Sequence, residues 1–197
     1  MARSTIADFL QNYLFHAEVV DTPIGADVLK GVRGEGHPVE GEAGFQSISG
    51  GNVNADVAEY REGIAPRWPR KVIGILNVDD FTFTRGEVPG DTIFFDWLMA
   101  YIAGYDARAD IHIYHYSKLD VPKGIEELKP EKATHTYKLF NAVPTSVKVV
   151  PDFDATSSEV AVSELTVSIE RVSVEVRSDI QKIGGVDWAT GNFVHSL

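Results

Sequence analysis

The stretch from Glu59 to Trp97 decides the architecture of this chain, and it reads EYREGIAPRWPRKVIGILNVDDFTFTRGEVPGDTIFFDW. With the residues before it, this stretch predicts one extended hairpin whose arms are residues 45–62 and 71–85. The turn between the arms, Gly63–Pro69, contains two prolines, which lack a backbone N–H and so prevent regular pairing at the tip. The second arm is the clearer one, because its phenylalanines and threonines alternate as on a half-buried strand.

The periodicity changes to helical between residues 91 and 103. Apolar side chains recur there at helical spacing: Ile93, Phe94, Trp97, Leu98, Tyr101 and Ile102. Asp91 or Thr92 is suited to cap the start of this helix, and Gly104 is suited to end it. We expect the aromatic stripe of the helix, Tyr101 included, to pack on the sheets.

Further segments alternate as strands do. Residues 13–20 and 110–117 each predict one strand, and residues 134–150 predict a strand pair or one strand interrupted at Pro144. Residues 159–176 are long for one strand and their apolar phase slips twice. Slips of this kind imply bulges or corners, so we expect this segment to pass from one sheet to another.

These elements predict a mainly β fold of two packed antiparallel sheets, as a sandwich or open barrel. The flanking helix spans about 91–103 and the extended hairpin about 45–85. A length of 197 residues suits a single domain, 1–197, which can bury a core of its own. From about residue 21 to 43 the chain is rich in glycine and mixed charge, which predicts a long loop.

The composition narrows the classes of function. A formal net charge of -11 disfavours free nucleic-acid binding, which depends on clustered Lys and Arg. The absence of cysteine excludes disulfides and thiolate metal sites. The N-terminal residues lack the apolar run of a signal peptide and no stretch approaches 18 apolar residues, so we expect a soluble product made in the cytoplasm, without membrane insertion.

The sequence predicts no catalytic, cofactor-binding or metal-binding residues. None of the histidines has the spacing of a helical metal pair, and His112 and His115 should point to opposite faces of one strand. The acidic segment 152–159 lacks the central glycine of a calcium loop, so we interpret it as a solvated turn. The sequence also lacks the glycine-rich motifs that bind nucleotide phosphates and the Gly-x-Ser-x-Gly motif of a nucleophile elbow. We therefore expect no enzyme activity.

The charged end of the hairpin has two interpretations. Its cations, interleaved with an aromatic residue, resemble a platform for single-stranded nucleic acid. Glutamates stand among them in an already acidic chain, so salt-bridged contact with another protein copy explains the mixture better. The candidate inter-subunit contacts, including two residues off the buried side of the helix, are Glu59, Arg61, Glu62, Arg67, Trp68, Arg70, Lys71, Phe95 and Met99.

An ordered series of motifs carries a family likeness over roughly residues 9–172. The motifs are Gly44-Phe45, Ser47, Ser49-Gly50, Glu59-Tyr60-Arg61-Glu62-Gly63, Arg70-Lys71, Thr84-Arg85-Gly86, Asp91-Thr92, Trp97, Asn141-Ala142, Pro144, Ser157-Ser158-Glu159-Val160-Ala161 and Glu164-Leu165. The series resembles the tail tube protein family, which forms the inner tube of contractile-tailed phages and of related contractile injection systems. The likeness implies hexameric rings that stack into a hollow tube inside a sheath, with the sheets of six copies lining the lumen.

The resemblance also implies the partners of the chain. They are copies of itself, the sheath protein, and baseplate and tube-terminator proteins, while DNA or protein cargo passes through the lumen without specific binding. The hairpin residues would then contact neighbouring subunits, and the final location would be the tail or injection particle. Compared with the family pattern, the chain has a loop insertion at about 21–43 and a C-terminal extension at about 173–197.

Two alternatives remain open at this point. A tube-initiator or baseplate adaptor of the same family would share the motifs but occur in few rings per particle. A β-sandwich carbohydrate-binding module or hydrolase would use Trp68, Trp188 or the loop of Asp152 and Asp154 on a glycan. Fold class alone licenses no function, and no convergent polar set supports this second alternative.

Overall fold

The computed structural model describes residues 10–21, 45–61, 63, 68–87, 89–117, 130–154, 156, 158 and 160–177, and the short strands at 186–187 and 192–193. All structural statements below concern these residues, called the described residues.

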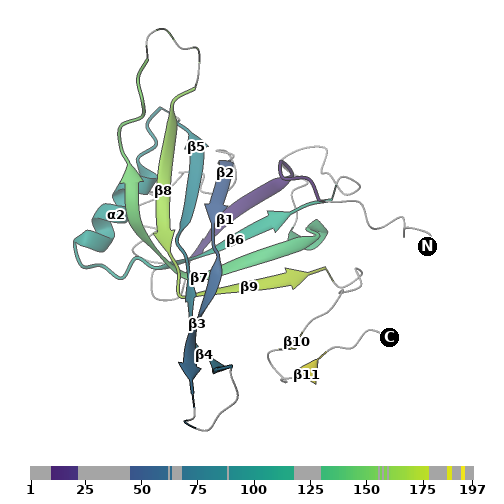
Figure 1. Cartoon of the computed structure of the whole chain (residues 1–197). Coiled ribbons are helices and arrows are strands. Elements are labelled where there is room, and N and C mark those ends of the chain that lie inside the picture. Colours follow the sequence, from purple (N-terminus) through teal and green to yellow (C-terminus); the bar gives the residue numbers. More distant parts are fainter. Residues whose placement is uncertain are drawn as a thin grey trace.

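Over the described residues the fold is mainly antiparallel β with one α-helix, as predicted (Figure 1). The elements in chain order are β1 (Phe15–Asp21), β2 (Phe45–Gly50), β3 (Val53–Tyr60), β4 (Arg70–Val78), β5 (Phe81–Gly86), α2 (Ile93–Ile102), β6 (Ala109–His115), the 3-10 turn η3 (Pro130–Lys132), β7 (His135–Lys148), β8 (Val162–Ser168), β9 (Arg171–Val176), β10 (Val186–Asp187) and β11 (Asn192–Phe193). Strands β10 and β11 pair only with each other.

The long strand β7 belongs to two sheets. Its first part, from His135 to Phe140, pairs with β6 and β9 and, with β1, makes sheet A. Its second part, from Val143 to Lys148, pairs with β8 and, with β5 and β2, makes sheet B. The backbone changes direction at Asn141, whose φ is +54°. Among the described residues, Asn141 is the non-glycine residue that has a positive φ. Asparagine tolerates this left-handed conformation better than most residues do, so the bend falls where the sequence permits it.

Pro144 does not interrupt β7. The strand continues through it, with a register shift before Ser146. This part of β7 is an edge of sheet B, since β8 is its neighbour there. A proline is tolerated on an edge because its missing N–H breaks no pairing with a second neighbour.

The segment 159–176 does pass between the sheets. Strand β8 lies in sheet B, the chain turns at Ile169 and Glu170, and β9 lies in sheet A. The predicted corner is therefore confirmed, and it lies beside the bend in β7 because Glu170 N–H donates to the carbonyl of Phe140 at 3.2 Å.

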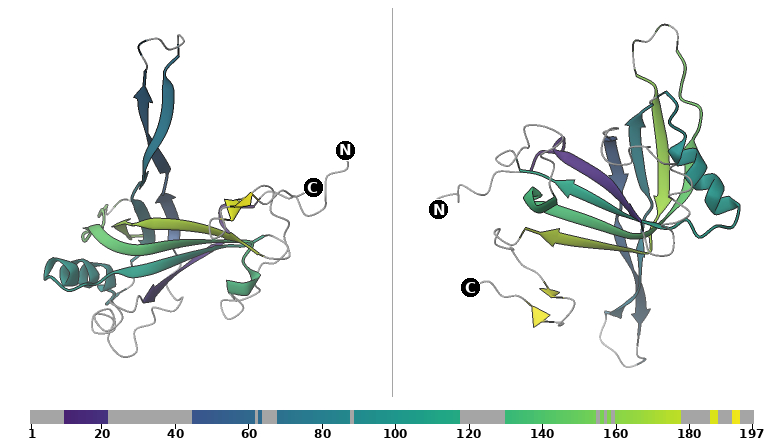
Figure 2. Two further views of the ribbon diagram at one scale, coloured as in Figure 1. Left: turned by 90° about the horizontal axis from the view of Figure 1, so that it is seen from below. Right: turned by 180° about the vertical axis from the view of Figure 1, so that it is seen from behind.

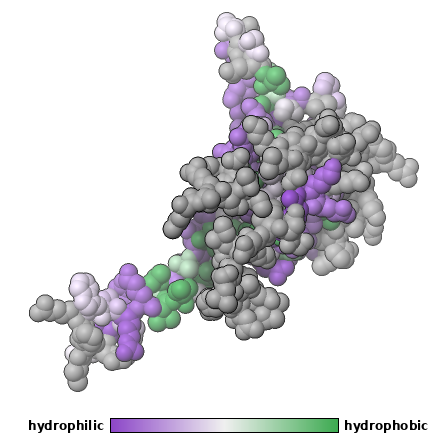
Figure 3. Space-filling model, turned by 90° about the vertical axis from the view of Figure 1, so that its right-hand side faces the viewer, coloured by the Kyte–Doolittle hydropathy of each residue, from purple (hydrophilic) through white to green (hydrophobic). Residues whose placement is uncertain are grey.

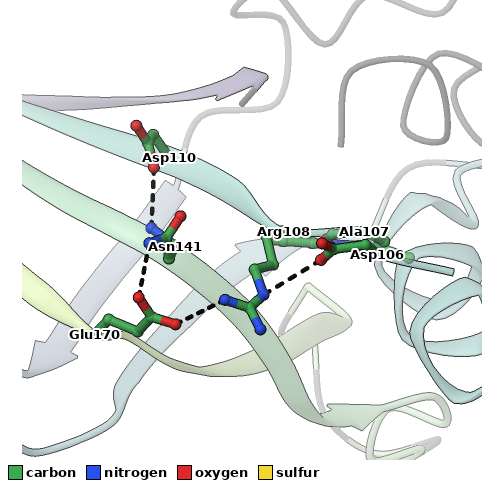
Figure 4. Close-up of polar contacts among 7 residues, drawn as sticks. Asp106, Ala107, Arg108, Asp110, Asn141 and Glu170 are labelled. Carbon is green, nitrogen blue, oxygen red and sulfur yellow. Dashed lines mark hydrogen bonds and ion pairs between the residues drawn. The ribbon is translucent and has the colours of Figure 1, made fainter. Parts of the chain in front are cut away.

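A polar network holds the chain at this corner (Figure 4). The Asn141 backbone N–H donates to Asp110 Oδ1 at 2.9 Å, and its side-chain Nδ2 donates to Glu170 Oε2 at 2.7 Å. The other oxygen of Glu170 accepts from Arg108 Nη1 at 2.7 Å, and Arg108 also pairs with Asp106 at 3.2 Å. The network joins the start of β6 to both halves of the bend, so it fixes the angle between the sheets.

The core lies between the two sheets, with α2 covering one side. Phe94 and Trp97 of the helix are buried in it, and Trp97 Nε1 donates to the carbonyl of Ala107 at 2.5 Å. The prediction for Tyr101 was wrong, because its position near the last turn leaves it 38% exposed. Asp91 accepts from the Ile93 N–H at 3.1 Å, and Gly104, with φ 91°, follows the helix, so both expected helix ends are confirmed.

Candidate inter-subunit docking surface

The hairpin of β3 and β4 projects from the body of the molecule as a long arm (Figure 2). The predicted arms are confirmed, since the pairing runs from Phe45 opposite Arg85 to Tyr60 opposite Arg70. Each predicted arm is divided into two strands. The first arm is interrupted between Gly50 and Val53, and the second is interrupted at Asp79 and Asp80. The arm therefore has a base, where it leaves sheet B, and a free part made by β3 and β4.

The base of the arm is held rigidly. Asp79 accepts two side-chain hydrogen bonds, from Asn52 and from Asn54, each at 3.0 Å, and its N–H donates to the carbonyl of Asn52 at 2.9 Å. Gly50 and Gly51 have φ of 103° and 77°, where a Cβ would overlap the Asp80 carbonyl and the Phe81 ring respectively. These contacts join β3 to the start of the Asp79–Asp80 turn, and the two glycine positions leave no room for a side chain.

A β-bulge decides which side chains share a face of the arm. Ala55 pairs with Leu76, but the next residue on that face, Val57, pairs with Ile73. Strand β4 therefore carries one extra residue, and both Gly74 and Ile75 fall on the opposite face. Without this bulge, the alternation of β4 would place Ile73 on the other face from Leu76.

One face of the arm is consequently an exposed apolar stripe. We call it the arm stripe, and its members are Val53, Ala55, Val57, Ile73, Leu76 and, partly buried at the base of the arm, Val78. Ile73 is 72% exposed and Leu76 is 66% exposed, although side chains of this kind are normally buried. In Figure 3 the hydrophobic residues gather on the half of the arm near the body, and hydrophilic ones lie farther out. A contiguous exposed apolar surface of this kind marks an interaction site.

The far end of the arm carries the predicted charges. Lys71 and Glu59 lie opposite each other with Nζ and Oε1 3.7 Å apart, and both side chains are more than half exposed. A pair so exposed contributes little to stability, so its placement matters for recognition more than for folding. Arg70 lies opposite Tyr60, and Trp68 is 81% exposed.

The remaining predicted contacts are placed differently. Glu62 and Arg67 lie outside the described residues. Phe95 and Met99 are exposed on α2, away from the arm in sequence, and Phe95 lines a cavity of about 160 Å³ with Lys148 and Val149. The structure therefore brings the charged hairpin residues together but assigns Phe95 to a second surface.

A buried ion pair forms the floor of that cavity. Arg85 Nη2 lies 2.6 Å from Asp91 Oδ2, and the Arg85 guanidinium stacks on the Phe94 ring at 3.9 Å from its centroid. The pair joins the end of β5 to the start of α2, and both side chains are less than one-sixth exposed. Its members belong to motifs noted in the sequence, but the pairing depends on tertiary contact.

The face of sheet A that points away from the core carries polar side chains together with the buried ring of Tyr114. Glu18 lies opposite His112, and His112 opposite Lys138, along one row across three strands. In the next row the ring of His16 stacks with that of Tyr114. Burial lowers the pKa of both histidines, and burial together with Glu18 raises the pKa of Tyr114.

Sequence reasoning missed the arm stripe. A signal was present, because Val72 to Leu76 is a nearly unbroken apolar run within the predicted extended hairpin. Among the described residues, no group of three or more His, Cys, Asp or Glu side chains is placed to hold a metal ion. Within the same part of the chain, no helix has the length and apolarity needed to cross a membrane.

Comparison with known proteins shows the family. No curated protein sequence matches the chain. Residues 35–173 match the family described as T4-like virus tail tube protein gp19. The chain belongs to this tail tube family. The resemblance stated from the motifs is thereby confirmed, and the family is one of structural tube proteins.

Solved structures agree with membership of the tail tube family. A chain of the PVC sheath–tube complex, from an extracellular contractile injection system in the extended state, is 26% identical, with 89% of this chain and 99% of that chain covered and a TM-score of 0.64. A chain of the PVC sheath/tube terminator is 26% identical, with 87% of this chain and 100% of that chain covered and a TM-score of 0.60. A chain of the anti-feeding prophage tube-terminating cap shares the fold, with a TM-score of 0.62. It is 23% identical, with 89% of this chain and 96% of that chain covered.

Proposed function

We propose that this tail tube protein is the structural subunit of the inner tube of a contractile injection system. Copies form hexameric rings, and the rings stack around a lumen that conducts cargo. The observation that carries the proposal is the arm stripe, a rigidly based and exposed apolar surface in a chain of the tail tube family. A monomer gains nothing from such a surface, whereas a polymer buries it.

The arm is the part through which copies contact one another. Its stripe supplies apolar area, and its charged end, with Glu59, Arg61, Arg70 and Lys71, sets the register between copies. Trp68 adds a large exposed aromatic side chain of the kind that is enriched at interfaces. Glu62 and Arg67 take part in the same contact.

The lumen is lined by sheet A. Its outward face carries both acids and bases, as in the row of Glu18, His112 and Lys138. The chain as a whole has a formal net charge of -11. A lumen of this composition lets DNA or acidic protein pass without holding it, because binding of polyanions needs clustered cations.

The further partners follow from the solved relatives, which are found in a sheath–tube complex and in a sheath/tube terminator. The chain contacts a sheath, a tube terminator and a baseplate, works in the assembled particle and has no enzyme activity. It is a single domain, 1–197, in which the loop at about 21–43 and the C-terminal residues from about 173 add contacts between rings or to the sheath. Residues 173–176 of that extension form part of β9.

Electron microscopy of the purified full-length protein tests the proposal. We expect rings or stacked tubes of uniform diameter, together with a monomer–oligomer equilibrium in analytical ultracentrifugation. A protein that stays monomeric at high concentration over a wide range of salt and pH would contradict it.

A tube-terminating or tube-initiating subunit is the second candidate. A chain from the structure of the PVC sheath/tube terminator matches at the same 26% identity as the chain from the sheath–tube complex, so this role is tested beside the first. The number of copies per particle separates the two roles, because a tube subunit occurs in many rings and a terminator or initiator in one or a few. Quantitative mass spectrometry of purified particles measures this number.

A further inference from the structure

The outward face of sheet A, which turns away from the core, carries two neighbouring rows of polar side chains. Alternation along β6 sends Ile111 and Ile113 into the core, so the residues between and beside them point outward. The strand register aligns the outward residues of all four strands. From β1 to β9, one row contains Glu18, His112, Lys138 and Ser173, and the other contains His16, Tyr114, Thr136 and Glu175.

The charges that this face carries at pH 7 balance one another. Beyond the two rows, the same alternation turns Asp110 of β6 and Arg171 of β9 outward, with Arg177 directly after β9. Three acids therefore stand against three bases, and the described part of the face has no net formal charge. The acids are Glu18, Asp110 and Glu175, and the bases are Lys138, Arg171 and Arg177.

Each of these charged groups is already engaged by a neighbour. Lys138 Nζ donates to Glu175 Oε1 at 2.8 Å, and Glu18 Oε2 accepts from the Tyr114 hydroxyl at 3.2 Å. The other contacts are those of Asp110 with the Asn141 N–H, Arg171 with the Phe140 ring at 4.1 Å from its centroid, and Arg177 with the Lys132 carbonyl at 3.0 Å. A charged ligand therefore finds little charge on this face that is not already compensated.

Two histidines are the groups of this face whose charge changes near neutral pH. The ring of His16 stacks with that of Tyr114, with centroids 6.2 Å apart, and His112 Nδ1 lies 3.3 Å from the Tyr114 hydroxyl oxygen. Burial lowers the pKa of both histidines, Lys138 lowers that of His112 further, and Glu18 opposes the shift in both. The ionisable groups around His112 come from all four strands and are Glu18, Asp110, Tyr114, Lys138 and Glu175.

Protonation of the two histidines makes the balanced face cationic. Each copy gains two positive charges, because the carboxylates stay largely ionised until the pH approaches about 4. Both histidines become charged below the ordinary histidine value of about 6.5, so the change falls in mildly acidic solution. In a ring the added charges of all copies face one enclosed lumen, where low-dielectric walls strengthen their combined field.

The geometry favours an acidic polypeptide over a nucleic acid as the ligand of this charged state. Tyr114 is 5% exposed and the Phe140 ring is covered by Arg171, so neither ring is open for a base to stack on. Two imidazolium groups per copy also fall short of the clustered Lys and Arg that hold a phosphate backbone. Peptide carboxylates need only single charge-assisted hydrogen bonds, which an imidazolium N–H donates.

Resting on the proposed tube function, we propose that the outward face of sheet A is an acid-dependent binding surface for acidic polypeptide. It holds such cargo when His16 and His112 are protonated and lets it move when they are neutral. The contacts are hydrogen bonds that the two imidazolium groups donate to carboxylates of the cargo. The same lumen therefore retains acidic cargo in mildly acidic solution and passes it at pH 7.

Co-sedimentation of assembled full-length tubes with a short fluorescent poly-aspartate peptide tests the proposal. Its carboxylates remain ionised at pH 5. We expect binding at least about tenfold tighter at pH 5 than at pH 7, and weaker again at high salt. The double variant His16→Gln, His112→Gln should lose this difference. The matched control His115→Gln, His135→Gln removes two histidines that lie opposite each other on the inward face of the same sheet, and it should keep the difference.

A lysine variant tests the charge in the opposite direction. His16→Lys, His112→Lys carries both positive charges at pH 7, so its tubes should hold poly-aspartate there. The proposal is overturned if tubes of the natural chain bind no tighter at pH 5, if the glutamine variant of His16 and His112 keeps the difference, or if the lysine variant binds nothing at pH 7. It is also overturned if single-stranded DNA is retained at pH 5 and poly-aspartate is not.

Electron microscopy of the same samples separates this proposal from the proposed function. If the natural chain forms no rings or tubes at either pH, the tube function fails. Fluorescence anisotropy of the same peptide with the dispersed chain then decides the binding surface by itself, with the same variants and the same expected order. If tubes form at both pH values and binding does not respond to pH, the binding surface alone is refuted.

Discussion

Removing the two most apolar members of the arm stripe should block assembly while leaving the fold intact. The double variant Ile73→Ser, Leu76→Ser deletes side chains that are 72% and 66% exposed in the monomer. Full burial of a Leu or Ile side chain stabilises by about 1.5–3 kcal/mol, so covering the exposed two-thirds of each is worth roughly 1–2 kcal/mol. For the pair the loss is about 2–4 kcal/mol per contact, which weakens association about 30- to 700-fold.

The critical concentration for assembly measures this effect, by sedimentation velocity with negative-stain microscopy of the same samples. The free energy of unfolding of the monomer should change by no more than about 0.5 kcal/mol, as is typical of surface substitutions, because neither side chain lies in the core. Its melting temperature should therefore stay nearly unchanged. Val72→Ser, Ile75→Ser is the matched control: it removes two apolar side chains, 58% and 79% exposed, from the opposite face of the same strand. The reasoning is refuted if the stripe variant assembles like the natural protein, or if the control blocks assembly equally.

Three further outcomes follow from the described contacts. Asp91→Asn leaves the buried Arg85 without its anionic partner and should destabilise the monomer by about 3–5 kcal/mol, seen as a clearly lower melting temperature; an unchanged melting temperature would contradict this. Burial lowers the pKa of His16 in the folded state, so below about pH 6.5 the unfolded chain binds the proton first and the free energy of unfolding falls as pH falls. The melting temperature of His16→Gln should therefore fall less between pH 7 and pH 5 than that of the natural chain. Identical pH profiles of the two proteins would refute a lowered pKa for His16. Reversal of Arg70 and Lys71 to glutamate should leave the monomer folded but prevent stacking, and tubes of unchanged length under the microscope would oppose it.

Much of the fold follows from local patterns. Alternation located the strands at 13–20 and 110–117 to within a few residues, and the helical period located α2. The phase slips in 159–176 predicted the corner between β8 and β9, because a strand that turns must change which residues face inward. These features are readable because each depends on neighbours in sequence.

The docking surface was only half predictable. The charged end of the arm is visible in the sequence as a cluster, whereas the arm stripe depends on the bulge in β4, which no local pattern reveals. The bulge is a property of how two strands align, so it appears only when Val57 is seen opposite Ile73. The partial exposure of Tyr101 was missed for a similar reason, since helical spacing says nothing about where the sheets end beneath a helix.

The sequence by itself determined the mainly β class, the position of α2, the length of the arm and the tail tube family, since all of these rest on the order and spacing of residues along the chain. Only the tertiary structure decided which face of the arm is continuously apolar, how β7 serves two sheets through Asn141, and that the arm and the connection between β7 and β8 lie at opposite ends of sheet B. The physical reason is that register and burial are set by contacts between residues far apart in the chain, and these contacts select one alignment among several that local propensity permits equally.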